Sequence, residues 1–584
     1  MFSKEILLSL HKPARYINQE LNTYHRDLKE VKLTFCLAYP DIYEVGMSNL
    51  GFRIIYDLIN QDQEVLCERT FLPWSDLEDY MRKNNVPLFS LESNIPLYNF
   101  DILGISIQTE FNYTGILNLL NLGKIPILSI ERNKNYPLVI AGGSSCFNPE
   151  PLADFIDLFV IGEGEEIILE IIKICKNRKK QIKDREGRQE LLIELAHLEG
   201  VYVPKLYSVD YENYGKIKRF YALDSALPQR IKKRIVSDLD NAYFPTKTVV
   251  PYIKIIHDRI GIEIMRGCPH NCRFCQARTI YYPKRERSIE KIIELANKNF
   301  LSSGYEEIAL LSLSSLDHSE IKKIFPTLTQ FFKNKGVSIS LSSLRVNQVM
   351  MDLLKEFQGM RRVGLTFAPE AGSERLRKII NKNIDIELLF KIAEEIFKFG
   401  WRGLKLYFMI GLPEENYKDI EEIVKIVYEI LAIMKKRNGT GTIRLSFNSF
   451  IPKPHTPFQW LPMENTDILK EKINYLKDKL RNKMIKYHFS PLQEDWLEAL
   501  LSRGDRKLCK VILKAWEKGA RLDGWREQFN FLAWEEAVKE TGINPDFYIY
   551  RKRELKEILP WDFIDVGIEK EKFVIDYQNF EKLS

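Results

Sequence analysis

Three cysteines, Cys268, Cys272 and Cys275, lie within eight residues in the stretch RGCPHNCRFCQAR. The other five cysteines are scattered singly, which is typical of buried free thiols. Closely spaced thiolates are metal ligands, but a structural zinc site needs a fourth ligand to close its tetrahedron. No second cysteine pair follows, and His270, between the first two thiols, is awkwardly placed to bind the same metal. The spacing indicates a metal site that is one protein ligand short.

Three thiolates can instead hold three irons of a [4Fe-4S] cluster and leave the fourth iron open to an outside ligand. With its Cys-x3-Cys-x-aromatic-Cys spacing, the segment resembles the radical S-adenosylmethionine (SAM) superfamily, and the resemblance extends over residues 255–465. It implies that Cys268, Cys272 and Cys275 bind the cluster. It also implies that the reduced cluster cleaves bound SAM to methionine and a 5′-deoxyadenosyl radical.

Further segments match the superfamily's SAM-binding positions. An aromatic residue before the third cysteine matches the one beside adenine, and MIGLPEE resembles the glycine turn against which adenine lies. In LLSLSSLD, serines stand where the family usually has a Gly-Gly-Glu-like segment, and FAPEAGSERL offers groups for the ribose, amine and carboxylate. The implied SAM-binding residues are Phe274, Ser312, Glu370, Ser373, Arg375 and Gly411.

These motifs follow the strands of a repeating strand–helix pattern. Six apolar segments alternate with amphipathic helices: IGIEIMRGC, EIALLSLSS, VSISLSSLR, RRVGLTFAPE, RGLKLYFMIGLP and TIRLSFNSF. Six such units predict a partial (β/α)6 barrel resembling a TIM barrel, in which chemistry takes place at the C-terminal ends of the strands. The cysteines follow the first of these strands.

A second α/β unit precedes the barrel. Between residues 31 and 170, continuous apolar strands alternate with helices, which predicts a doubly wound, Rossmann-like domain with its ligand site at the carboxyl ends of the strands. The segment YPDIYEVGMSNLGF resembles the Asp-x-His-x-x-Gly motif of cobalamin-binding domains, with a tyrosine in place of the histidine. Together with the glycine turns AGG and IGEGEE, it resembles the cobalamin-dependent radical SAM class. The implied cobalamin-binding residues are Tyr43, Gly46, Gly142, Gly143, Gly162 and Glu163.

The predicted organisation has five parts. An N-terminal helical extension (1–30) precedes the cobalamin-binding-like domain (31–215). A proline-containing linker (216–254) leads to the radical SAM barrel (255–480). A mostly helical C-terminal region (481–584) follows.

Composition narrows the class of protein. With 45% hydrophobic and 28% charged residues, the chain is a typical ordered globular one. Its net charge of +6 neither requires nor excludes a nucleic-acid partner. No apolar run approaches the ~20 residues that cross a bilayer, and the first residues do not form a signal peptide, so we expect a cytoplasmic protein without a membrane partner. The expected protein partner is a low-potential electron donor such as flavodoxin or ferredoxin.

The leading hypothesis is a radical SAM enzyme that uses a [4Fe-4S] cluster, SAM and cobalamin, and methylates an unactivated centre. One alternative is a cobalamin-independent radical SAM enzyme that modifies RNA or protein, in which the glycines of the first domain only shape turns. An alternative of another class is an Fe–S nucleic-acid-binding protein. The basic tracts at 176–189 and 228–234 suggest it. The sequence indicates neither a substrate nor a catalytic residue.

Overall fold

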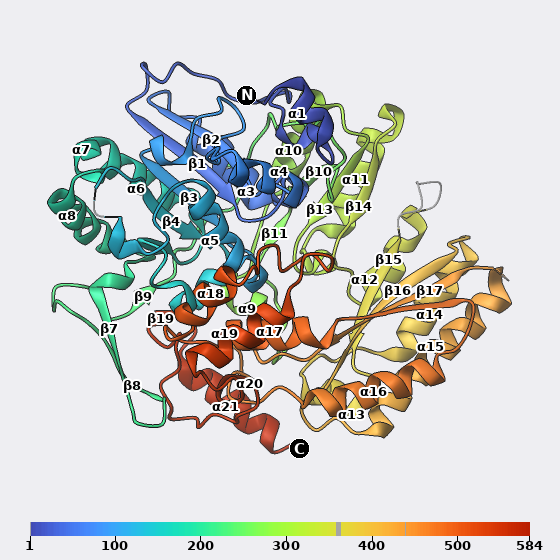
Figure 1. Cartoon of the computed structure of the whole chain (residues 1–584). Helices are drawn as coiled ribbons and strands as arrows, with labels where there is room; N and C mark the ends of the chain where they lie inside the picture. The colour runs from blue at the N-terminus through green and yellow to red at the C-terminus, as the bar shows by residue number, and fades with distance from the viewer. Residues whose placement is uncertain (1, 133, 358–363, 439, 584) are drawn as a thin grey trace.

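The computed structural model describes residues 2–132, 134–357, 364–438 and 440–583. The N-terminal domain and the barrel lie side by side, and the C-terminal helices lie against both (Figure 1). Among the described helices, none is both long enough and apolar enough to cross a lipid bilayer.

The N-terminal domain is built on a six-stranded sheet in the order β2-β1-β3-β4-β5-β6. Neighbours from β2 to β5 pair in parallel, and β6 is antiparallel to β5. The order 2-1-3-4-5 is that of a doubly wound fold, whose ligand site lies where the order reverses between β1 and β3. The predicted fold of this domain is confirmed. The strands are β1 (Leu33–Tyr39), β2 (Val65–Phe71), β3 (Ile102–Ser106), β4 (Leu138–Gly142), β5 (Leu158–Val160) and β6 (Val201–Tyr202).

Strand β2 was not predicted, because its sequence VLCERTF carries two charges in the middle. Both charged side chains are nevertheless buried. Arg69 pairs with Glu92 at 2.6 Å and with Glu20 at 2.5 Å, so that its charge is compensated inside the domain. Charged residues can therefore occupy a fully buried strand that a search for apolar runs overlooks.

The helices of this domain alternate with its strands, as predicted. Asn49 caps α3 by accepting a hydrogen bond from the backbone N–H of Phe52 at 2.8 Å. The glycine turn after β5 leads directly into α6. The principal helices are α3 (Leu50–Ile59), α5 (Tyr113–Leu122), α6 (Gly164–Asn177) and α8 (Arg185–Ala196).

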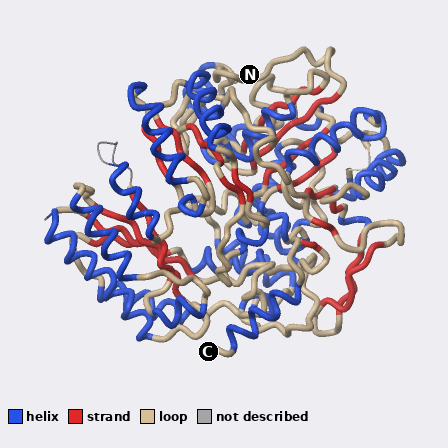
Figure 2. The backbone as a smooth tube through the Cα atoms, turned by 180° about the vertical axis from the view of Figure 1, so that it is seen from behind, coloured by secondary structure: helices blue, strands red, loops and turns tan. Residues whose placement is uncertain are grey.

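All six predicted barrel strands are present, and they form two parallel sheets. One sheet has the order β10-β13-β14 and the other β15-β16-β17-β18. Helices lie along the outer side of the second sheet (Figure 2). The strands are β10 (Ile260–Glu263), β13 (Glu307–Leu311), β14 (Ser338–Leu341), β15 (Leu365–Glu370), β16 (Gly403–Ile410), β17 (Thr442–Ser449) and β18 (Ile485–Phe489). The helices between them include α10 (Ile289–Ser303), α11 (Ile321–Phe332), α14 (Ile386–Lys398), α15 (Tyr417–Asn438) and α16 (Thr466–Lys479).

Strand β18 lies beyond the predicted end of the barrel at residue 480 and pairs in parallel with β17. Ile485 is its one fully buried side chain, and three exposed residues follow. An edge strand of this kind has no apolar alternation by which a sequence pattern would detect it. The linker likewise contains strands, since β8 (Ile217–Ala222) pairs with β7 (Tyr207–Tyr211) and β9 (Ile231–Lys232) pairs with β19 (Ile564–Asp565).

The predicted helical C-terminal region is present and binds both other parts. The side-chain amide of Asn148, in the N-terminal domain, donates to the carbonyl oxygens of Ser502 and Gly504 at 3.0 and 2.9 Å. The buried guanidinium of Arg503 donates to Pro452 O, in the loop after β17, at 3.1 Å. The region therefore holds the two α/β units together. Its main helices are α17 (Leu492–Ser502), α18 (Leu508–Glu517), α19 (Phe531–Thr541) and α21 (Lys570–Glu581).

Candidate functional site

The three predicted cluster cysteines lie in an irregular loop between β11 (Met265–Arg266) and α9 (Gln276–Ile280). Cys272 is buried and the other two are half-buried. Burial raises the pKa of all three thiols, that of Cys275 to about 11.

Two cations lie close enough to oppose that effect. Lys382 lowers the pKa of Cys272 and Cys275, and Arg345 lowers that of Cys268 and Cys272. One buried and two half-buried thiols beside two cations suit an anionic group held by thiolates. This donor set fits an iron–sulfur cluster.

Within the described part of the chain, no three metal-ligating side chains surround a single ion. A [4Fe-4S] cluster does not need that convergence, because each thiolate binds a different iron. His270 is engaged elsewhere, since its Nε2 lies 2.7 Å from Asp317 Oδ2. Burial works to raise the pKa of Asp317, but the hydrogen bonds from His270 and Ser314 outweigh it and lower that pKa. His270 therefore orients Asp317 beside the loop rather than completing a metal site.

Distant segments fix the cysteine loop. The backbone N–H of Arg273 donates to Ile380 O at 3.0 Å, and its Nε donates to Asp576 Oδ1 of α21 at 3.0 Å. Gly267, just before Cys268, has a φ of +82°, and a Cβ there would lie 2.7 Å from Pro283 O. The loop thus has a set conformation that only glycine permits at its start.

Three of the predicted residues gather around Lys382, which the sequence did not single out. Its Nζ lies 2.8 Å from Glu370 Oε1 and 5.9 Å from the centre of the Phe274 ring. The same amine offsets part of the rise that burial causes in the pKa of Cys272. The structure therefore brings Phe274 and Glu370 to the cysteine loop through a lysine that no superfamily motif marks.

The structure places Ser373, Arg375 and Gly411 in contacts between barrel elements. Ser373 caps α13 (Glu374–Ile379) and donates to Asp419, and Arg375 pairs with the same carboxylate at 2.6 Å. The N–H of Gly411 donates to Glu415 Oε2 at 2.7 Å. These three residues do not join the group around Lys382, and their role in SAM binding stays a prediction.

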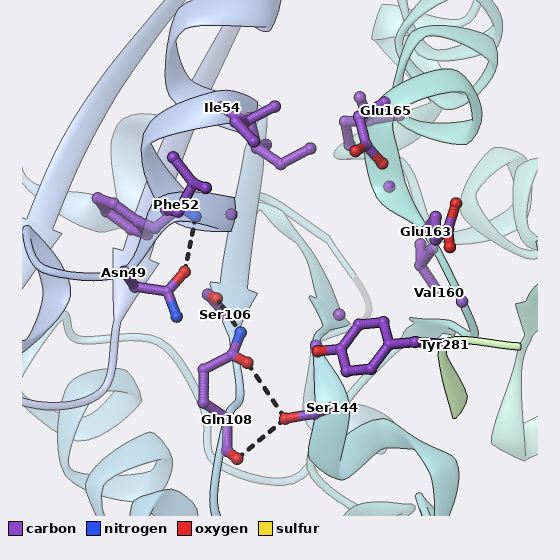
Figure 3. Close-up of a pocket in the computed structure, with 18 of the residues that line it drawn as sticks. Asn49, Phe52, Ile54, Ser106, Gln108, Ser144, Val160, Glu163, Glu165 and Tyr281 are labelled. Atoms are coloured by element: carbon purple, nitrogen blue, oxygen red, sulfur yellow. Dashed lines mark hydrogen bonds between the residues drawn. The ribbon is translucent and has the colours of Figure 1, made fainter. Parts of the chain in front are cut away.

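A cavity of about 450 Å³ lies between the carboxyl edge of the N-terminal sheet and the start of the barrel (Figure 3). Small-molecule sites commonly span roughly 300–1,000 Å³. Apolar side chains of β1, β3 and β4 line it at the reversal point of the strand order, where this fold binds ligands. Predicted residues of the cobalamin site and of the SAM site line this cavity. They are Gly142, Gly143, Gly162 and Glu163 from the former and Ser312 from the latter.

Tyr43 and Gly46 do not line this cavity. Tyr43, in the short helix α2 (Tyr43–Gly46), is buried and donates its hydroxyl to Glu20, next to the buried Arg69. A Cβ at Gly46 would overlap the ring of Phe71. Tyr43 thus packs against the N-terminal segment and Gly46 against Phe71 of β2, and their role in cobalamin binding stays a prediction.

Two glycines of the cavity wall hold backbone conformations that other residues rarely adopt. Gly143 has a φ of +124° and Gly162 a φ of +110°. A Cβ at Gly143 would overlap the carbonyl oxygen of Ile107, and one at Gly162 would overlap that of Arg234. Because glycine has no side chain, these turns let a ligand approach the backbone at the strand ends closely.

Gly143→Ala is expected to destabilise the protein by about 2–3 kcal/mol, because it adds a backbone overlap to an unfavourable φ. Gly304→Ala is the matched control, since Gly304 also has a positive φ, +70°, but has open space around its Cβ position. It is expected to cost about 1 kcal/mol. Urea unfolding of both variants measures the difference, and equal losses would contradict the overlap at Gly143.

A buried charge network joins the cavity to the cysteine loop. Arg266, two residues before Cys268, pairs with Glu163 at 3.0 Å and with Glu165 at 2.6 Å, both at the start of α6. Its third partner is Glu263 of β10, at 2.9 Å. Burial favours protonation of Glu163, but Arg285, which pairs with it at 2.6 Å, and Arg266 outweigh burial and lower its pKa. No sequence pattern predicts this network, because its members come from three separate segments.

Comparison with known proteins gives two matching family models. The model described as radical SAM proteins, N-terminal, matches residues 51–204. The model described as radical SAM superfamily matches residues 262–427, which include the cysteine loop.

Two curated relatives differ in how much of the chain they match. An uncharacterized protein of Methanocaldococcus jannaschii is 29% identical over 480 residues, which cover 82% of this chain and 90% of that protein. A ribosomal protein uS12 methylthiotransferase of Hydrogenobaculum is 24% identical over 224 residues, which cover 36% of this chain and 56% of the methylthiotransferase.

Among solved structures, the radical SAM methyltransferase TsrM of Kitasatospora setae, with cobalamin and a [4Fe-4S] cluster bound, is similar to this chain. The match covers 87% of this chain and 99% of that chain, with a TM-score of 0.51 and 10% identity. At that identity the similarity shows a shared fold.

Proposed function

The chain belongs to the radical SAM superfamily, and we propose that it cleaves SAM reductively and uses cobalamin, bound in the cavity, to methylate an unactivated centre. One observation carries this proposal. The glycine turns of the N-terminal domain and Ser312 of the barrel line the same cavity, and Gly267, the neighbour of Cys268, lines it too. Ligands of the two domains would therefore lie next to each other.

The residues present fit both cofactors. When bound, the reduced cluster supplies the electron that cleaves SAM, and cobalamin supplies a carrier for the methyl group. Cys268, Cys272 and Cys275 would hold the cluster, with Lys382 and Arg345 balancing its negative charge. The glycine turns at the strand ends would let the backbone approach cobalamin, and the apolar walls of the cavity would exclude water.

The basic tract at 176–189 gives little support to nucleic-acid binding. Lys176 pairs with Asp62 at 2.5 Å, and Arg178 pairs with Glu194 at 2.6 Å. Arg188 is buried and is bound to Asp157 at 2.6 Å. Cations that are already paired contribute little to a phosphate-binding surface, which favours the enzyme over a nucleic-acid-binding protein.

We further propose a cytoplasmic location and a low-potential electron donor, such as flavodoxin or ferredoxin, as partner. All eight cysteines are free thiols, which is usual in a reducing compartment. The electron for SAM cleavage must come from outside the chain.

Anaerobic purification with hydroxocobalamin supplied tests this function. Analysis is expected to give about four irons, about four sulfides and about one cobalt per chain, and reduction in the presence of SAM is expected to release 5′-deoxyadenosine. Iron without cobalt would favour a cobalamin-independent enzyme that modifies RNA or protein, the class suggested by the methylthiotransferase relative. Absence of both metals, with no SAM cleavage, would overturn both enzyme hypotheses.

A further inference from the structure

Tyr281 presents a hydroxyl to the cavity from the barrel side. It follows α9, which begins directly after Cys275. Its ring lines the cavity, and the hydroxyl points into it (Figure 3). Tyr281 is thus a side chain at the junction of the cysteine loop and the cavity.

The backbone around Tyr281 is held in place. Lys233 Nζ donates to Thr279 O at 2.8 Å and to Ile280 O at 3.3 Å, at the end of α9. Arg285 Nη2 donates to Tyr281 O at 3.3 Å. These bonds fix the end of the helix and therefore the backbone position from which the Tyr281 side chain extends.

The hydroxyl itself makes no hydrogen bond to any residue that the structure describes. Burial raises the pKa of Tyr281, so the phenol keeps its proton at neutral pH and can donate. The nearby charges, among them Arg266 and Glu163, are already paired with one another. Tyr281 is half-buried in the cavity wall, and its hydroxyl has no partner among the described side chains, so the hydroxyl is free to bind a ligand.

Polar side chains at the ends of β3 and β4, which also line the cavity, hydrogen-bond to one another. Gln108 Nε2 donates to Ser106 Oγ at 2.9 Å, and Ser144 Oγ donates to the Gln108 side-chain oxygen at 3.1 Å (Figure 3). Those side chains are linked to one another across the ends of β3 and β4. Tyr281 contributes a donor from the cluster side that no described side chain accepts.

We propose that the Tyr281 hydroxyl donates a hydrogen bond to a peripheral amide of cobalamin and fixes the position of that cofactor relative to the cysteine loop. The inference rests on the proposed function, because it takes cobalamin as the ligand of the cavity. It adds a binding residue that the cobalamin-like motifs do not contain. Its chemistry is recognition of an amide carbonyl by a neutral donor.

Titration of the full-length protein with hydroxocobalamin under anaerobic conditions, followed by absorbance, tests the role of Tyr281. Tyr281→Phe removes the hydroxyl and keeps the ring. It is expected to weaken cobalamin binding about three- to tenfold, the usual effect of losing one neutral hydrogen bond. Tyr282→Phe, at an adjacent side chain that is 44% exposed, is the matched control and is expected to leave affinity unchanged. Iron content and the thermal midpoint are expected to stay at the wild-type values in both variants.

The outcomes separate the two proposals. If the wild-type protein binds cobalamin and Tyr281→Phe binds it equally well, the role of Tyr281 is wrong and the proposed function stands. If the wild-type protein binds no cobalamin, the cobalamin function fails and the role of Tyr281 fails with it. Loss of iron from Tyr281→Phe would assign the hydroxyl to the cysteine loop and would contradict its role toward cobalamin.

Discussion

Cys272→Ala is expected to abolish the iron–sulfur cluster and, with it, all reductive cleavage of SAM. Cys272 is the most deeply buried of the three loop cysteines, and Lys382 and Arg345 both favour its thiolate. A cluster left with two protein ligands loses one of the three irons that the chain can hold. Iron and sulfide analysis after anaerobic reconstitution, together with an assay for 5′-deoxyadenosine, measures the loss. We expect the same result for Cys268→Ala and Cys275→Ala.

Cys509→Ala is the matched control for this series. Its thiol is fully buried in the C-terminal region and donates to Pro151 O at 3.2 Å. The variant loses some packing but is expected to keep its iron and its SAM cleavage. A Cys272→Ala protein that retained a full complement of iron would contradict the assignment of the cluster, and so would a well-folded Cys509→Ala protein without iron.

Arg266→Met is expected to lower the free energy of unfolding by about 3–5 kcal/mol, the usual cost of breaking a buried ion pair from one side. The guanidinium is buried with three carboxylates around it. Methionine keeps about the length of the aliphatic part of arginine but has no charge, so Glu165 and Glu263 would be left with less compensation. Two of the three partners belong to the N-terminal domain. The substitution therefore also removes ion pairs that connect the cavity with the cysteine loop.

Urea unfolding measures this effect, with Arg219→Met as the control. Arg219 is well exposed and pairs at 3.2 Å with Asp210, which is also exposed. Such surface pairs contribute at most about 1 kcal/mol, so this variant is expected to unfold close to the wild type. If Arg266→Met unfolded at the same urea concentration as Arg219→Met, the network around Arg266 would not be the interdomain tie described above.

The sequence predicted the elements whose signals are local. Apolar strands, amphipathic helices and a tight cysteine motif gave the doubly wound sheet, the six barrel strands and the cluster loop. Strand β2 was overlooked because its charges are compensated by Glu20 and Glu92, which lie elsewhere in the chain. Strand β18 was overlooked because an exposed edge strand need not be apolar.

The candidate site was less predictable for a related reason. Motif positions fix where a residue lies along a strand, but the direction of its side chain depends on neighbours that fold against it. Thus Glu370 pairs with Lys382 beside the cysteines, whereas Arg375 pairs with Asp419. Lys382 and Arg266 belong to no motif, and only tertiary contacts place them at the site. Tyr281 directly follows the short helix after the cluster motif, but nothing in its sequence context shows that it reaches the cavity.

The bond between Arg273 and Asp576 has a consequence for the order in which the enzyme matures. The two residues are 303 positions apart, and the bond fixes the cysteine loop to α21. During synthesis the three cysteines leave the ribosome long before Asp576 does. A cluster delivered to the nascent chain would meet a loop that lacks this support. Loading of iron is therefore best timed after α21 has been synthesised and has docked against the cysteine loop.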